Sequence, residues 1–249
     1  MNKLEHNLEQ KNITLIWSVT FFSLFFALLC IVIMFFVPEN TLASSDIQVT
    51  EEAFSIPPDD EDDVDAEYSA QFQNYVDEYR NRSDASTELY ASINSRSAVE
   101  WFYAHIVGDK QLSSIILHAA EKYNISLTLA FSIAYNESHY KTTAQRTNPN
   151  GTIDRGLFQL NSRSFPTMNE SEFFDPAKNA EQAMKFFRYC LNTAGNEITA
   201  LAIYNAGAGR VETGGTPSMT LAYISHVISY RKTLDDLFYQ EVAMFYEEY

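Results

Sequence analysis

An uncharged apolar run near the start of the chain sets the first limit on its fold. Residues 13–37, ITLIWSVTFFSLFFALLCIVIMFFV, contain no Asp, Glu, Lys or Arg. An α-helix rises about 1.5 Å per residue, so a run of this length can cross a hydrocarbon core of about 30 Å. We therefore predict a transmembrane helix over residues 13–37, preceded by a short tail, residues 1–12.

Basic residues around this run predict its orientation. Lys3 and Lys11 precede it, and the next Lys or Arg after it is Arg80. Because basic flanks stay in the cytoplasm, we expect a single-pass inner-membrane protein with a cytoplasmic N-terminus and a periplasmic or extracellular remainder. The alternative is a cleaved signal peptide, since residues 41–43 (TLA) weakly resemble a cleavage site. The apolar region of such peptides is normally only about 7 to 15 residues long.

Charge is distributed unevenly along the chain, whose net charge is −16. Residues 46–67 hold ten acids and no base, whereas residues 68–249 hold 20 acids and 15 bases. An acidic segment with prolines and few large apolar residues cannot bury enough surface to fold, and self-repulsion extends it. We predict a flexible linker over residues 38–67 and one domain over residues 68–249. The sequence has no basic stripe, which argues against nucleic acid as a partner.

The domain shows a mainly helical pattern, with apolar residues recurring at intervals of three and four. In SLTLAFSIAYNESHY, Ser126 is available as an N-cap, and Glu137 falls on the same stripe as Ala130, Ile133 and Ala134. Ionised carboxylates are seldom buried without a partner. Glu137 is therefore either part of a structural pair or an acid whose raised pKa suits proton transfer.

The segment after this helix predicts a small β-hairpin. Asn150-Gly151 lies between the extended stretches TAQRT and TIDRG, which places Asp154 on the returning strand. Acids beside such turns are commonly solvated, and the adjacent Arg155 is a candidate ion-pair partner. Gln159 follows among apolar residues, where an amide needs hydrogen-bond partners or a polar ligand.

Two further helix boundaries can be read from the sequence. Asp175-Pro176 predicts a helix start, and YNAG at residues 204–207 predicts a helix end. The histidines show no metal-ligand spacing, and no glycine-rich phosphate loop follows a strand. We therefore expect no metal and no cofactor.

Taken in order, these segments resemble a known family, the soluble lytic transglycosylase domain of the lysozyme-like superfamily. The resemblance covers residues 112–238 and rests on Glu137-Ser138, GLFQL at 156–160, Phe174-Asp175-Pro176 and YNAG at 204–207. It implies a mainly α lysozyme-like fold, in which a helical lobe and a small hairpin flank a groove for peptidoglycan strands.

The resemblance also implies roles for individual residues. Glu137 corresponds to the catalytic acid and base. The positions that correspond to substrate-binding or supporting residues are Ser138, Phe158, Gln159, Tyr204, Asn205 and Tyr223. Phe158 stands where the family usually has Met.

Three functions remain open at this point. The first is a membrane-anchored lytic transglycosylase, in which Glu137 acts alone and Asp154 is an accessory that orients the hairpin or assists the developing cation. The second is a hydrolytic muramidase, because residues 137–165 are also similar to animal C-type lysozymes, which use a second acid at the position of Asp154. The third is a non-catalytic peptidoglycan-binding module, which would be expected to have lost Glu137. We favour the first, with peptidoglycan as partner and protein partners unknown.

Overall fold

The computed structural model describes residues 70, 72–77, 79, 84–212 and 218–246. The chain divides into two units, residues 1–59 and 60–249, and every described residue belongs to the second. The predicted tail, membrane span and linker lie outside the described residues. Within the described part, no helix combines the length and the apolar character that crossing a bilayer would require.

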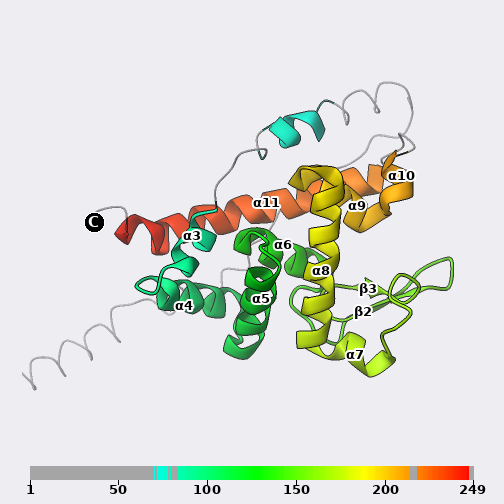
Figure 1. Cartoon of the computed structure of the whole chain (residues 1–249), viewed down its shortest axis with the longest axis horizontal. Coiled ribbons are helices and arrows are strands. Elements are labelled where there is room, and N and C mark those ends of the chain that lie inside the picture. Colours follow the sequence, from blue (N-terminus) through cyan, green and yellow to red (C-terminus); the bar gives the residue numbers. More distant parts are fainter. Residues whose placement is uncertain (1–69, 71, 78, 80–83, 213–217, 247–249) are drawn as a thin grey trace, which may run out of the picture. The chain divides into compact units, whose positions relative to one another are not determined.

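The described part is mainly helical with a small sheet, as predicted (Figure 1). Residues 72–77 are helical. The helices that follow are α3 (Ala85–Ala91), α4 (Arg96–Val107), α5 (Lys110–Lys122), α6 (Leu127–Ser138), α7 (Glu170–Phe174), α8 (Pro176–Ala194), α9 (Glu197–Ala206), α10 (Ala208–Glu212) and α11 (Ser218–Glu241), with a 3-10 turn over Ala243–Phe245. The strands are β1 (Gln145–Thr147), β2 (Ile153–Arg155) and β3 (Leu160–Asn161).

The predicted helix boundaries are confirmed, each by a specific contact. The Ser126 side chain accepts a hydrogen bond from the Leu129 amide at the start of α6, and Asp175 accepts from the first amides of α8, which begins at Pro176. α9 ends at Ala206 and is followed by Gly207, whose φ of +86° favours glycine.

The carboxylate of Asp84 caps the N-termini of two helices, α3 and α6. One oxygen accepts from the amides of Ser86 and Thr87 in α3. The other accepts from the Ser126 hydroxyl at 2.6 Å and from the Thr128 amide at 3.1 Å, in the first turn of α6. The start of α6 is therefore fixed to a segment more than forty residues upstream.

α6 is the central helix of the core, and it packs against α5 and α11. Every residue from 127 to 134 is buried, so the helix is enclosed more completely than a single apolar stripe predicts. Phe131 stacks on Tyr103 of α4 with ring centroids 3.9 Å apart, and Phe238 of α11 meets Phe102 edge-on. The last turn of α6, which carries Glu137, is therefore held by a rigid element.

The sheet is antiparallel with the order β1-β2-β3, so the predicted hairpin is present and gains a third strand. Its turn closes through the Asn148 amide and the Thr152 carbonyl, with Gly151 at a φ of +79°. Asp154 lies on β2, the returning strand, opposite Arg146 of β1 and Asn161 of β3. The central strand thus brings side chains from both neighbours to one carboxylate.

Candidate active site

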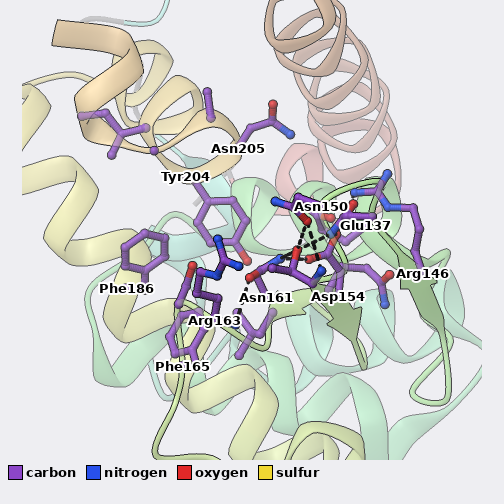
Figure 2. Close-up of a pocket in the computed structure, with 18 of the residues that line it drawn as sticks. Glu137, Arg146, Asn150, Asp154, Asn161, Arg163, Phe165, Phe186, Tyr204 and Asn205 are labelled. Atoms are coloured by element: carbon purple, nitrogen blue, oxygen red, sulfur yellow. Dashed lines mark hydrogen bonds and ion pairs between the residues drawn. The ribbon is translucent and has the colours of Figure 1, made fainter.

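A cavity of about 650 Å³ lies between the sheet and the C-terminal end of α9 (Figure 2). Glu137 and Asp154 both line it, together with Gln159, Tyr204 and Asn205. A second cavity of about 460 Å³ shares lining residues with the first, among them Asn205, and extends to Tyr223 on α11. The two adjoining cavities form one groove with room for an extended ligand.

Glu137 lies in the last turn of the buried helix α6 and lines this groove. The Tyr223 hydroxyl donates a hydrogen bond to Glu137 Oε1 at 2.9 Å. Burial raises the pKa of Glu137 to about 7, against the opposing effects of the Tyr223 hydrogen bond and the Arg146 charge, while the negative charge of Asp154 adds to the rise. The carboxyl is therefore half protonated near neutral pH and can both donate and accept a proton.

Asp154 is 6% exposed and lies within a set of hydrogen-bond donors. Its Oδ1 accepts from Asn161 at 2.6 Å, and its Oδ2 accepts from Arg146 at 3.0 Å and from Asn148 at 2.9 Å. The side chain is thus a buried, charge-compensated anion and an organiser of the hairpin.

This environment corrects two expectations about Asp154. The carboxylate is not a solvated turn charge, and its ion-pair partner is Arg146 rather than Arg155. Successive side chains of a strand point to opposite faces, so the neighbour in sequence points away while the cross-strand neighbour shares the face. Arg155 instead approaches Glu170, at 3.7 Å.

Tyr204 and Asn205 occupy the last turn of α9 and line the cavity. The Tyr204 hydroxyl donates to the Phe158 carbonyl at 3.1 Å, and Asn205 Oδ1 accepts from Thr220 of α11 at 3.1 Å. In Figure 2, Tyr204, Phe186 and Phe165 form one wall, and ring centroids 5.6 Å apart join Phe186 to each of the other two. Aromatic faces beside amide groups suit a ligand with alternating apolar and hydroxylated surfaces.

Gln159 lines the cavity in a strained backbone conformation, with a φ of +44°. Its amide nitrogen donates to the carbonyls of Ala144 and Gly156 at 3.0 and 2.8 Å. These bonds fix the side chain between the residue that precedes β1 and the loop that leads to β3.

Ser138 and Phe158, which the resemblance placed with the substrate-binding residues, are buried and are not among the residues that line either cavity. The Ser138 hydroxyl donates to the Leu157 carbonyl at 2.7 Å, and so ties the end of α6 to the loop. Phe158 is fully buried, and its amide donates to Asn179 Oδ1 at 2.8 Å. Both residues position the wall of the groove from behind.

The same loop is tightly constrained at Gly156, which has a φ of +78°. A Cβ atom there would lie 2.0 Å from the Phe173 carbonyl oxygen and 2.5 Å from Asn179 Nδ2. Asn179 Nδ2 itself donates to the carbonyls of Phe173 and Arg155. The loop therefore requires a glycine at position 156, and the side-chain amide of Asn179 holds the backbone on either side of it.

Several lining residues were not singled out from the sequence: Arg146, Asn148, Asn161, Arg163, Phe165 and Phe186. The hairpin signal at residues 150–151 could have identified Arg146, because pairing across that turn places it opposite Asp154. In the part of the chain that the structure describes, no group of three His, Cys, Asp or Glu residues could hold a metal ion.

Comparison with known proteins agrees with this geometry. Residues 114–224 match the family model "Transglycosylase SLT domain". The chain is 30% identical over 109 residues to "Membrane-bound lytic murein transglycosylase F" of Cellvibrio japonicus, an alignment that covers 41% of this chain and 21% of that protein. It is 33% identical over 95 residues to "Protein IpgF" of Shigella flexneri, covering 36% of this chain and 62% of that protein.

The chain thus spans about a fifth and about three fifths of the lengths of these two relatives. No solved structure matches the chain significantly. The family match begins in α5 and ends in α11, so it contains Glu137, the sheet, the glycine-restricted loop and the end of α9. The resemblance predicted from the motifs is confirmed: residues 114–224 of this chain are similar to the transglycosylase SLT domain family.

Proposed function

We propose that this protein is a lytic transglycosylase that cleaves the β-1,4 bond between N-acetylmuramic acid and N-acetylglucosamine in peptidoglycan. The observation that carries the proposal is the carboxyl of Glu137, which faces an elongated groove and has a pKa of about 7. Cleaving a glycosidic bond requires protonation of a poor leaving group, and a carboxylic acid that stays neutral near pH 7 can supply that proton. The family match and the name of the Cellvibrio relative agree with this activity.

The proposed reaction uses Glu137 twice. Its proton passes to the bridging oxygen, the bond from that oxygen to C1 of the muramic acid breaks, and positive charge develops at C1. The carboxylate then removes the proton of the 6-hydroxyl of the same sugar, whose oxygen bonds to C1. The product is a 1,6-anhydro ring, no water is consumed, and Glu137 returns to its protonated form. The Tyr223 hydroxyl, which donates a hydrogen bond to Oε1, supports this proposal because it stabilises the carboxylate form.

Hydrolysis by a pair of carboxylates is the second candidate, because Asp154 lines the same cavity as Glu137. Both oxygens of Asp154 are already engaged, by Asn161 on one side and by Arg146 and Asn148 on the other. A carboxylate held in this way can stabilise a nearby cation electrostatically, but it is a poor nucleophile. We therefore assign Asp154 the accessory role. A purely binding module would not need Glu137 to have a raised pKa.

Mass spectrometry of digested peptidoglycan tests the reaction. We expect products that end in 1,6-anhydromuramic acid, which are lighter by one water than the reducing ends that hydrolysis gives. Glu137→Gln should lower the rate of cleavage by a factor of about 10² to 10⁴, because Gln cannot donate the proton. Circular dichroism would verify that this variant folds. Reducing ends from the wild type, with an inactive Asp154→Asn variant, would support the paired mechanism instead.

We further propose that residues 13–37 anchor the enzyme in the inner membrane with the domain outside the cytoplasm. The support is the uncharged run with lysines on its N-terminal side, together with the words "membrane-bound" in the name of one relative. Protease added to spheroplasts should release the domain and leave a small membrane fragment. A mature chain that begins near Ser44 would show cleavage of the segment and contradict the anchor.

A further inference from the structure

Helix α11 contacts the end of α6 through two tyrosines. Tyr223 donates a hydrogen bond to Glu137 Oε1 at 2.9 Å. Tyr230 lies seven residues further along α11, close to two helical turns, so the two side chains share one face of the helix. Tyr230 is only 5% exposed and is not among the residues that line either of the two cavities. It is therefore out of reach of a ligand in the groove, and any effect it has on the site must pass through the protein.

Tyr230 contacts residues on both sides of Glu137 in the sequence. Its ring stacks flat on that of Tyr135, with centroids 3.9 Å apart and an angle of 2° between the planes. Its hydroxyl shares a hydrogen bond of 3.3 Å with the hydroxyl of Tyr140. Burial raises the pKa of Tyr230 to about 12 and raises the pKa of Tyr140 well above its ordinary value. The pair therefore stays neutral over the range in which Glu137 titrates.

The backbone directly after α6 is strained. His139 and Tyr140 have φ angles of +52° and +62°, in the left-handed region that a bulky side chain seldom adopts. Such a conformation persists only where the surrounding contacts hold it. The Tyr140 ring packs against Phe131 and Tyr135, with centroids 6.3 and 5.6 Å away, and its hydroxyl meets Tyr230. The turn that follows the last turn of α6 is thus held in part from α11.

We propose that Tyr230 is a positioning residue: it holds the last turn of α6 against α11, and so keeps Glu137 within hydrogen-bond reach of Tyr223. A hydrogen bond weakens steeply as its angle departs from the preferred range, so a small displacement of this turn would weaken the bond that stabilises the carboxylate. The geometry at Glu137 can be tested without any substrate. Only the effect on catalysis rests on the proposed function.

The other ionisable groups that act on Glu137 lie on different elements. Besides burial, Arg146 of β1 lowers the pKa of Glu137 and Asp154 of β2 raises it. Tyr204 of α9 also faces Glu137, whose charge contributes to a raised pKa of that tyrosine after burial. Arg146 and Asp154 bind each other across the sheet, and the Tyr204 hydroxyl binds a loop carbonyl. A change at Tyr230 therefore reaches Glu137 through α6 and α11 rather than through these groups.

The test measures the pKa of Glu137 directly, by carbon-13 NMR of the full chain in detergent micelles with the Glu side-chain carboxyls labelled. The spectrum of Glu137→Gln identifies the resonance. Tyr230→Phe removes the hydroxyl and keeps the ring. We expect it to raise the pKa of Glu137 by about half a pH unit, because a weakened hydrogen bond stabilises the carboxylate less. The decline of kcat/KM above about pH 7 should move upward by the same amount.

Two comparisons separate positioning from a loss of stability. In a Tyr223→Phe background the hydrogen bond to Glu137 is absent, so adding Tyr230→Phe should change the pKa of Glu137 by less than about 0.1. Tyr103→Phe is the matched control. Its hydroxyl makes a buried hydrogen bond to Ser86 at 2.8 Å, and its ring also stacks on α6. This variant should lower Tm and leave the pKa of Glu137 unchanged.

Three outcomes would overturn the inference. The first is a Tyr230→Phe chain in which Glu137 keeps its wild-type pKa. The second is an equal rise of that pKa in the Tyr223→Phe background, which would show that Tyr230 acts by another route. The third is an equal rise in Tyr103→Phe, which would assign the effect to a general loosening of the core. If the chain cleaves no peptidoglycan, the proposed function fails, and the NMR titration still decides the inference.

Discussion

Replacing Glu137 by Gln should increase the free energy of unfolding relative to wild type above about pH 5, because a buried carboxyl with a raised pKa destabilises the folded chain there. Burial raises the pKa of Glu137 from 4.5 to about 7. Below about pH 4.5 the group is protonated in both the folded and the unfolded chain, so it costs nothing. Between the two pKa values the unfolded chain releases the proton and the folded one retains it, so the free energy of unfolding falls with rising pH.

The size of this effect follows from the two pKa values. Their difference corresponds to about 3 kcal/mol once the pH exceeds about 7. Because Glu137 lines a cavity and keeps some contact with water, we discount this to about 2 kcal/mol between pH 5 and pH 8. Gln has the same shape and can still accept the hydrogen bond from Tyr223, so the variant should lack the cost without losing packing.

The assay is thermal or denaturant unfolding of wild type and Glu137→Gln at pH 5 and pH 8. Groups other than Glu137 titrate alike in both proteins, so their contributions cancel in the difference. We expect the variant to gain about 2 kcal/mol relative to wild type over this interval, or about 4–8 °C in Tm for a domain of this size. A stability difference that is the same at both pH values would show that the pKa of Glu137 is not raised, and would refute the reasoning.

Three further changes follow from contacts in the groove. Tyr223→Phe removes the hydrogen bond that lowers the pKa of Glu137, so the decline of kcat/KM above about pH 7 should move to higher pH, and a shift to lower pH would contradict this. Asp154→Asn should lower the turnover number by about tenfold without changing the identity of the product in mass spectrometry, whereas complete inactivity would make Asp154 a catalytic partner. Gly156→Ala should lower the free energy of unfolding in urea by about 3 kcal/mol or more, since its Cβ would overlap the Phe173 carbonyl, and near-wild-type stability would mean that the loop yields easily.

The local features of the fold could be predicted from the sequence because their causes are local. Ser126 and Asp175 cap helices within three residues of themselves, and the turn at Gly151 depends on a backbone conformation that glycine favours. The place of Glu137 at the inner end of a buried helix followed from the spacing of apolar residues. These predictions needed no knowledge of what lies beyond the segment.

Contacts between distant segments could not be predicted in the same way. Tyr223 reaches Glu137 across 86 residues, and the aromatic wall joins Phe165 to Phe186 and Tyr204 from three separate elements. The ion-pair partner of Asp154 is set by the pairing of β1 with β2, which places Arg146 opposite it. The sequence alone favoured Arg155, because that residue is adjacent in the chain. The buried positions of Ser138 and Phe158 depend on contacts of the loop at residues 156–159 with α6 and α8. The spacing of apolar residues along the sequence cannot predict such contacts.

The double helix cap at Asp84 limits how this domain can be exchanged between proteins. The family match starts at residue 114, but the acceptor for the Thr128 amide and the Ser126 hydroxyl lies thirty residues earlier. A chimera joined at the family boundary would leave the first turn of α6 without that acceptor and would loosen the helix that ends in Glu137. A chimera that keeps this cap must therefore be joined upstream of Asp84, so the unit that folds together is larger than the segment that matches the family model.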